Sequence, residues 1–127
     1  MLDTTGGIMN GAVLIRWGTG IPGREAKGLD VLGKAVGRFE ELTKQGRVHS
    51  HREYFSLTGR DGGFMLVEGE VEELMKILGE EETLQLNAQA AAIVAEFEIQ
   101  AFAGGSDQTT QELVRNYTAS LQELGIM

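Results

Sequence analysis

The sequence predicts an α+β domain in which a four-stranded antiparallel sheet carries helices on one face, followed by one more helix. Three observations indicate this class. Four short segments rich in β-branched and aromatic residues alternate with segments whose apolar residues recur every three or four positions. A glycine-containing loop joins the second and third strand segments and predicts a hairpin. A chain of 127 residues, 42% of them hydrophobic, is long enough to bury one core.

The N-terminal part is predicted to consist of an arm, a strand and an amphipathic helix. Residues 1–10 show no periodicity, so we expect a flexible arm there. Residues 12–17 are nearly all apolar, which is typical of a central strand covered on both faces. After a glycine-rich loop, residues 25–44 are predicted to form a helix that ends before Gly46. Its apolar face comprises Leu29, Leu32, Val36, Phe39 and Leu42.

Residues 47–58 and 63–68 are predicted to form a hairpin joined by residues 59–62. Asp61 and the glycines of this loop are residue types that a tight turn requires. With four residues in the loop, Glu53 would lie beside Glu68 on one face of the ladder. Phe55 and Leu57 would share that face with Leu66 and Phe64. A longer loop would change this pairing.

The C-terminal part is predicted to contain two helices and the last strand. Residues 71–78 have helical spacing, whereas residues 80–92 fit either a helix or a loop. Residues 93–102 contain an alternation typical of a strand. Thr109 and Glu112 match a capping box for a final helix. The apolar stripe of that helix comprises Leu113, Tyr117, Leu121 and Leu124.

This order of elements is the βαββαβ order of the ferredoxin-like fold. We therefore divide the chain into an N-terminal arm (1–10), a ferredoxin-like domain (11–104) and a C-terminal helix (105–127). Helices would cover one face of the sheet, yet both faces of the strands carry apolar residues. The sequence thus predicts a homodimer through the uncovered sheet face, with the final helix packing on the partner or closing an edge.

The stretch from Gly62 to Gly69, followed by Glu72, Glu73 and Leu74, resembles the YCII-related branch of the dimeric α/β-barrel superfamily. The resemblance covers residues 11–103 and implies a barrel that the fourth strand closes with the partner's sheet. The site proposed for that family includes a histidine soon after the first strand and an Asp-Pro pair after the second helix. This chain has no histidine before His49, and Glu81-Glu82 stands in place of the pair. The catalytic residues of the family therefore do not carry over.

The charge and composition argue against several classes of partner. With 11 basic and 19 acidic residues the net charge is -8, which disfavours nucleic acid and anionic membranes. The sequence has no apolar run long enough to cross a bilayer and no targeting signal at its start, so we expect a cytoplasmic protein. The absence of cysteine excludes a thiol nucleophile and a thiolate metal site.

Gly18, Gly20 and Gly23 match the spacing of the dinucleotide-binding fingerprint and follow a predicted strand. That fingerprint requires a parallel strand next, ending in an acidic residue that binds the ribose. Here the next strand enters a hairpin. We therefore favour a flexible loop at the mouth of a barrel over a nucleotide site.

His49, His51 and Glu53 lie on the same predicted strand face and are metal-ligating residue types. Side chains two apart on a flat strand are about 7 Å from each other, so one ion would need a further ligand such as Glu68. Without it they are surface or interface residues. We favour that interpretation and predict no metal site.

The leading hypothesis is a dimeric α/β-barrel protein that binds a small organic molecule between helices and sheet or between two sheets, with no cofactor. The residues expected to line the cavity are Trp17, His49, His51, Glu53 and Glu68. A second hypothesis is a cofactor-free or heme-dependent oxygenase of the kind found in the superfamily, which would lose activity in His49→Ala or His51→Ala. A third is a regulatory or assembly module without an enclosed pocket.

Overall fold

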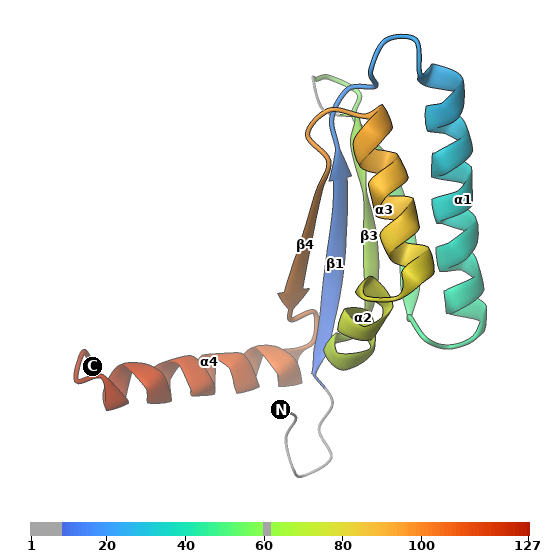
Figure 1. Ribbon diagram of the computed structural model, residues 1–127. Coiled ribbons are helices and arrows are strands. Elements are labelled where there is room, and N and C mark those ends of the chain that lie inside the picture. The colour runs from blue at the N-terminus through green and yellow to red at the C-terminus, as the bar shows by residue number, and fades with distance from the viewer. Residues whose placement is uncertain (1–8, 60–61) are drawn as a thin grey trace.

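The computed structural model describes residues 9–59 and 62–127 of the chain (Figure 1). The elements are, in order, β1 (Asn10–Trp17), α1 (Glu25–Lys44), β2 (Ser50–Phe55), β3 (Gly63–Glu70), α2 (Val71–Leu78), α3 (Glu81–Ile93), β4 (Glu98–Ala103) and α4 (Asp107–Glu123). Most of the arm expected at residues 1–10 lies outside the described residues. β1 begins two residues earlier than expected, at Asn10.

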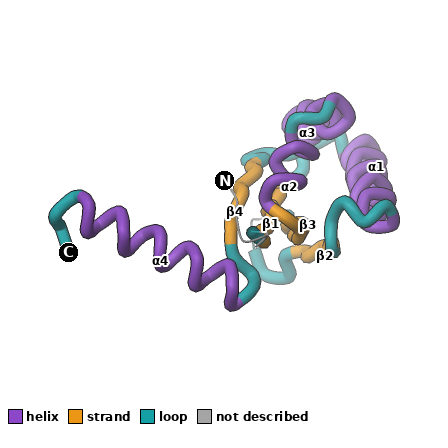
Figure 2. Tube along the Cα trace, turned by 90° about the horizontal axis from the view of Figure 1, so that it is seen from below, coloured by secondary structure: helices purple, strands orange, loops and turns teal. Residues whose placement is uncertain are grey.

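The strands form a single sheet in the order β2-β3-β1-β4, and every neighbouring pair is antiparallel. This is the predicted ferredoxin-like α+β fold. Helices α1, α2 and α3 all lie on one face of the sheet (Figure 2). The core forms between them and the sheet, from Val13, Ile15, Met65 and Val67 on the strands and from Phe39, Leu42, Leu74 and Ile77 on the helices.

The register of the β2–β3 hairpin differs from the prediction. Its loop spans residues 56–62, and Glu53 pairs with Met65 while Ser50 pairs with Glu68. Relative to the predicted pairing, β2 is shifted along β3 by an odd number of residues. Each β2 side chain therefore shares its face with the other set of β3 side chains. Glu53 therefore lies on the helix-covered face and Glu68 on the open face. The predicted turn residue Asp61 lies outside the described residues.

The hairpin loop is longer than expected because its end is bonded to another strand. The Gly62 N–H donates to the Trp17 carbonyl oxygen of β1 at 2.9 Å. The Ser56 N–H in turn donates to the Gly62 carbonyl oxygen at 3.0 Å. Leu57, expected to continue β2, belongs to this loop and is 96% exposed.

The sequence did not decide whether residues 80–92 form a helix or a loop. In the structure they are helical from Glu81 onward and form most of α3. The last strand consequently begins at Glu98 and not at residue 93. Ile93 ends α3, and Val94 forms an isolated bridge with Gly20. The predicted strand began too early, because Ile93 and Val94 are apolar and fit the start of a strand as well as the end of a buried helix.

The N-terminus of α4 is capped by Ser106, whose Oγ accepts a hydrogen bond from the Thr109 N–H at 3.2 Å. The predicted capping box of Thr109 and Glu112 is therefore wrong. Thr109 is buried inside the first turn, and its Oγ1 accepts a hydrogen bond from the Asn10 N–H at 3.0 Å. This bond ties the start of α4 to the start of β1.

Beyond its first turns, α4 projects away from the sheet and the other helices (Figures 1 and 2). Tyr117 and Leu124 of the predicted apolar stripe are 66% and 71% exposed. None of the helices in the described part of the chain has the length and hydropathy of a membrane-spanning segment.

Candidate functional site: an apolar cavity between the sheet and two helices

A cavity of about 450 Å³ lies between the helix-covered face of the sheet and helices α1 and α3. The strands contribute Ile15, Trp17, Phe55 and Met65, and Phe97 precedes β4. The helices contribute mainly Leu29, Val31, Leu32, Phe39, Leu86 and Ile93. The walls are therefore dominated by aliphatic and aromatic side chains, as in most small-molecule sites.

Small residues at facing positions leave this space unfilled. Gly28 and Ala35 of α1 and Ala90 of α3 all line the cavity. Larger apolar side chains at these helix positions would pack against the sheet. The cavity thus follows from residue size at a few positions on two helices.

Trp17 forms part of the wall and packs against the backbone of Gly62 and Gly63, at the end of the hairpin loop and the start of β3. A Cβ atom at Gly62 would lie 2.3 Å from Trp17 Cδ1 and 2.4 Å from the Gly18 carbonyl oxygen. The Trp17 ring also contacts Phe55 edge to face, with centroids 6.0 Å apart. Only a residue without a side chain fits at position 62.

The polar groups of the cavity come from α3 and from the entrance. Thr83 and Asn87 lie one helical turn apart on α3 and both line the cavity. Arg24 and Glu25 at the start of α1 are exposed. The Arg24 guanidinium donates to the Ala92 carbonyl oxygen, which links the start of α1 to the end of α3.

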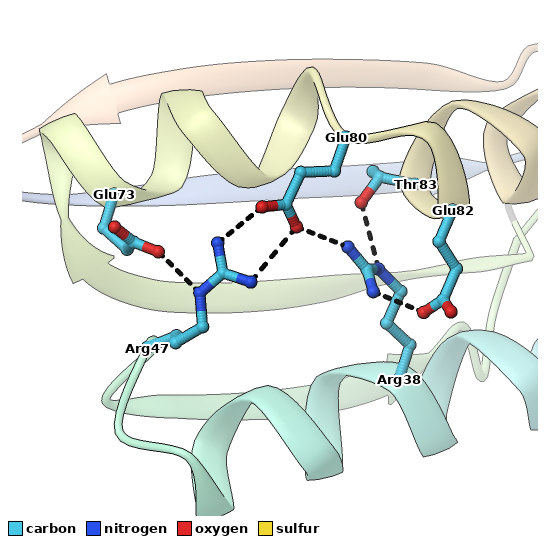
Figure 3. A network of polar contacts seen from close by, with 6 residues as sticks. All are labelled: Arg38, Arg47, Glu73, Glu80, Glu82 and Thr83. Atoms are coloured by element: carbon cyan, nitrogen blue, oxygen red, sulfur yellow. Dashed lines mark hydrogen bonds and ion pairs between the residues drawn. The ribbon is translucent and has the colours of Figure 1, made fainter.

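A network of ion pairs holds the α3 wall against α1 and the sheet (Figure 3). Arg38 of α1 donates from Nε to Thr83 Oγ1 at 3.0 Å and from Nη2 to Glu80 Oε1 at 2.9 Å, and it also pairs with Glu82. Arg47, before β2, donates to Glu80 Oε2 at 2.7 Å and to Glu73 Oε2 at 2.6 Å. Glu80 thus connects two arginines.

Within this network, Glu80 and Arg47 shift each other's pKa. Hydrogen bonds from Arg47 are the main reason that the pKa of Glu80 is lowered, and those from Arg38 add to the effect against the cost of desolvation. Hydrogen bonds to Glu80 and Glu73 raise the pKa of Arg47. The lowered pKa of Glu80 and the raised pKa of Arg47 keep both groups charged at neutral pH, so this pair positions α3 and is not suited to proton transfer.

Of the five residues that the sequence suggested for the cavity, Trp17 lies on its wall. The other four are not among the lining residues. His49 is exposed and precedes β2, and Glu68 is on the open face of the sheet, where Arg52 Nη2 donates to its Oε1 at 2.8 Å. From this set the structure joins the side chains of His51 and Glu53, whereas His49 and Glu68 meet through the backbone, with the His49 N–H donating to the Glu68 carbonyl oxygen at 2.7 Å.

His51 lies between two carboxylates at the contact of β2 with α1. Its Nδ1 is 2.6 Å from Glu53 Oε2, and its Nε2 is 2.8 Å from Glu40 Oε2. Burial lowers the pKa of His51, but the hydrogen bonds to Glu53 and Glu40 together outweigh it and raise the pKa above its usual value. Within residues 9–59 and 62–127, no cluster of His, Asp and Glu is arranged to hold a metal ion.

The glycine loop after β1 pairs with the connection between α3 and β4. The Gly18 N–H donates to the Ala95 carbonyl oxygen at 2.8 Å, and the Ile21 N–H donates to the Ile93 carbonyl oxygen at 2.9 Å. The loop lines one end of the cavity. It is, however, held by backbone hydrogen bonds, and two of the N–H groups that a phosphate would need are already used.

Sequence reasoning missed the residues that α3 contributes. Residues 80–92 show no dominant apolar face, because alanines lie on both the inner and the outer sides of the helix. The one available signal was the spacing of Leu86, Ala90 and Ile93, which places them on one helical side.

No protein-family model and no curated protein sequence matches the chain. Among solved structures, a conserved protein from Methanosarcina mazei Go1 is similar with a TM-score of 0.60 and 14% identity, covering 76% of this chain and 95% of that one. A candidate antibiotic biosynthesis monooxygenase from Caulobacter crescentus CB15 gives a TM-score of 0.55 at 15% identity, covering 78% and 92%. Another from Chloroflexus aurantiacus J-10-fl gives 0.51 at 13% identity, covering 76% and 94%.

At these identities the likeness concerns the fold: a four-stranded ferredoxin-like α+β domain of the kind found among antibiotic biosynthesis monooxygenase-like proteins. About a quarter of this chain lies outside each match.

Proposed function

We propose that this protein binds a small, mainly apolar organic molecule in the cavity between the sheet and helices α1 and α3. The observation that carries the proposal is the cavity of about 450 Å³ with its aliphatic and aromatic lining. An unfilled space of this kind destabilises a core, because the surrounding atoms lose packing contacts. A bound ligand would restore those contacts.

The proposal includes a homodimer formed through the open face of the sheet. Leu14, Phe64 and Leu66 point to this face, together with Tyr54 and Phe102, which are 43% and 50% exposed. The apolar stripe is flanked by the ion pairs of Arg16 with Glu98 and of Arg52 with Glu68. Both signs of charge on one face suit a twofold contact, in which a basic group can meet an acidic group of the second copy.

The projecting helix α4 also supports a second copy as the occupant of that face. An isolated helix of this length is only marginally stable in water. Its apolar side chains Val114, Tyr117 and Leu124 are exposed, and α4 begins just after β4, the sheet edge that carries Phe102. Packing on the partner would cover this surface together with the open sheet face.

We extend the proposal to the YCII-related branch of the dimeric α/β-barrel superfamily. The support is the glycine-led strand β3 and the glutamates that follow it in α2. The structure supplies a physical reason for the first part of this pattern, since Gly62 and Gly63 pack against Trp17.

A second candidate is an oxygenase that acts on a molecule bound in the same cavity. It is favoured by the two neighbours named as candidate antibiotic biosynthesis monooxygenases, each of which covers more than three quarters of this chain. Conversion of a phenol and O2 to a quinone and water balances without a further reductant. Because His49 and His51 do not line the cavity, they are not suited to act on its ligand. Oxygen uptake with 1-naphthol distinguishes this candidate from binding alone.

Trp17 is the only tryptophan of the chain and lines the cavity, so its fluorescence reports on occupancy. We expect an apolar probe such as 1-tetralone to change the Trp17 emission on titration. Ala90→Phe fills the cavity from α3 and should weaken binding about tenfold or more, since a bulky side chain then occupies the ligand's volume.

The matched control is Ala88→Phe, at an exposed position of the same helix that does not line the cavity. This variant should bind the probe as the unmodified protein does. The proposal is wrong if no apolar probe changes the Trp17 emission, or if Ala88→Phe and Ala90→Phe weaken binding equally.

A further inference from the structure

Asn87 occupies a position of α3 where an apolar side chain is expected. The face of α3 that lines the cavity consists of residues at helical spacing, namely Thr83, Leu86, Asn87, Ala90 and Ile93. Leu86, Ala90 and Ile93 are apolar, as a helix that faces a core requires. Asn87 lies in the middle of this face and is half-buried.

The carboxamide of Asn87 has unused hydrogen-bonding capacity. It offers two N–H donors and one acceptor oxygen, and within the described part of the chain none of them bonds to another side chain or to the backbone. Because no side-chain N or O atom of the described residues is both buried and unpartnered, the Asn87 amide is reached by solvent through the cavity. Leucine has nearly the same shape and would extend the apolar wall without polar atoms. This polar side chain therefore suits a ligand and not the core.

The other polar groups of the lining are either engaged or at the surface. Thr83 Oγ1 already accepts a hydrogen bond from Arg38 Nε at 3.0 Å. Thr19, Arg24 and Glu25 are exposed at the entrance. Among the residues that the structure describes, none places a charged side chain in the inner part of the cavity, and a charged ligand group there would find no partner among them.

We propose that the ligand is an uncharged, largely apolar compound with one hydrogen-bonding carbonyl oxygen, and that the Asn87 side-chain N–H donates to this oxygen. The inference rests on the proposed function, because it concerns the same cavity. It goes further in assigning the polarity of the ligand and the residue that recognises it.

The test compares three probes of similar size: tetralin, 1-tetralone and 1,2,3,4-tetrahydro-1-naphthoate. Their affinities are measured by isothermal titration calorimetry with the unmodified protein, with Asn87→Leu and with Gln89→Leu. Gln89 is an exposed amide of the same helix that lies outside this cavity, so Gln89→Leu is the matched control.

The unmodified protein should bind 1-tetralone about five- to tenfold more tightly than tetralin, the effect of one hydrogen bond, and the charged probe most weakly. In Asn87→Leu this preference should fall to less than about threefold, through weaker binding of 1-tetralone and unchanged or tighter binding of tetralin. Gln89→Leu should keep the preference. Asn87→Leu should also unfold at a higher temperature, which shows that the variant is folded.

Equal affinity of 1-tetralone and tetralin for the unmodified protein would overturn this inference and leave the proposed function standing. A preference that persists in Asn87→Leu would overturn it as well, because the contact would then belong to another group. Tightest binding of the carboxylate would exclude an uncharged ligand. If none of the three probes binds, the proposed function itself fails.

Discussion

Because Gly62 has no side chain, its backbone can pack directly against Trp17 in the wall of the cavity. The backbone of this residue lies against the Trp17 indole and is bonded to the Trp17 carbonyl oxygen. The same contact lengthens the β2–β3 loop and thereby sets which residues of β2 face the helices. One close approach of backbone to ring therefore has consequences for the whole hairpin.

We expect Gly62→Ala to displace the Trp17 ring and to lower the free energy of unfolding by about 1–3 kcal/mol, the usual cost of overpacking. Trp17 emission should shift to longer wavelength as the ring becomes more accessible to water. Emission spectra and urea unfolding measure both effects. Gly37→Ala in α1 is the control, because its added Cβ meets no atom within 4 Å and should stabilise the helix by about 0.5–1 kcal/mol. Unchanged emission in Gly62→Ala would contradict this account of the site.

Helix α1 contacts its neighbouring elements through two polar clusters, one around Arg38 and one around Glu40. Arg38 connects it to α3 through the network with Glu80, whose lowered pKa keeps its carboxylate charged near neutral pH. Glu40 connects it to β2 through His51, whose charge changes with pH. Only the second contact should make the packing of α1 depend on pH near neutrality.

The raised pKa of His51 fixes the sign of that dependence. The folded state binds the proton more tightly than the unfolded state, in which the pKa is near 6.5. The stabilisation is complete below this value and is lost as the pH rises through the pKa of the folded state. We expect His51→Gln to lower the free energy of unfolding by about 1.5–3 kcal/mol at pH 6, the usual range for hydrogen bonds to charged groups, and by less at pH 9.

Urea unfolding at both pH values measures this difference, and His49→Gln is the control because His49 is exposed. The control should match the unmodified protein at each pH. If the decrease in the free energy of unfolding of His51→Gln is larger at pH 9 than at pH 6, the raised pKa assigned to His51 is wrong.

At the scale of the whole molecule, the asymmetry of the sheet is the main feature. Three helices cover one face of the sheet (Figure 2). The other face and the projecting α4 carry exposed apolar side chains. Exposed apolar surface of this kind is typical of interaction sites, and we propose that a second copy covers it. The proposed homodimer follows from this asymmetry and is independent of the cavity.

We expect the unmodified protein to sediment as a dimer at micromolar concentration and Leu66→Glu to sediment as a monomer. Leu66 points to the open face from the central strand β3, and a carboxylate there would be buried in the contact without a partner. Leu57→Glu is the control, since Leu57 lies in the hairpin loop and not in the sheet. Sedimentation velocity distinguishes the two states. A monomeric unmodified protein would exclude this dimer.

The sequence by itself determined the class of the fold and the order of its elements except for α3. Periodicity is a local property, so the alternation in β2 and the helical spacing of α1 and α2 could be read without knowledge of the contacts. Charge and the absence of cysteine were likewise available from composition. Of the five residues named for the candidate site, Trp17 is the one that lies on the wall of the cavity; it was named as an aromatic residue at the end of a strand beside a glycine loop.

The tertiary structure alone decided the hairpin register, the helical state of residues 80–92 and the membership of the cavity. Each depends on contacts between segments far apart in the chain: Gly62 with Trp17, Arg38 with Glu80 and Thr83, and His51 with Glu40. His51 and Glu53 were correctly placed on one strand face, yet their function depends on what α1 presents to them. Asn87 stands out only when α3 is known to face the sheet, because a polar residue has no special meaning until its surroundings are apolar.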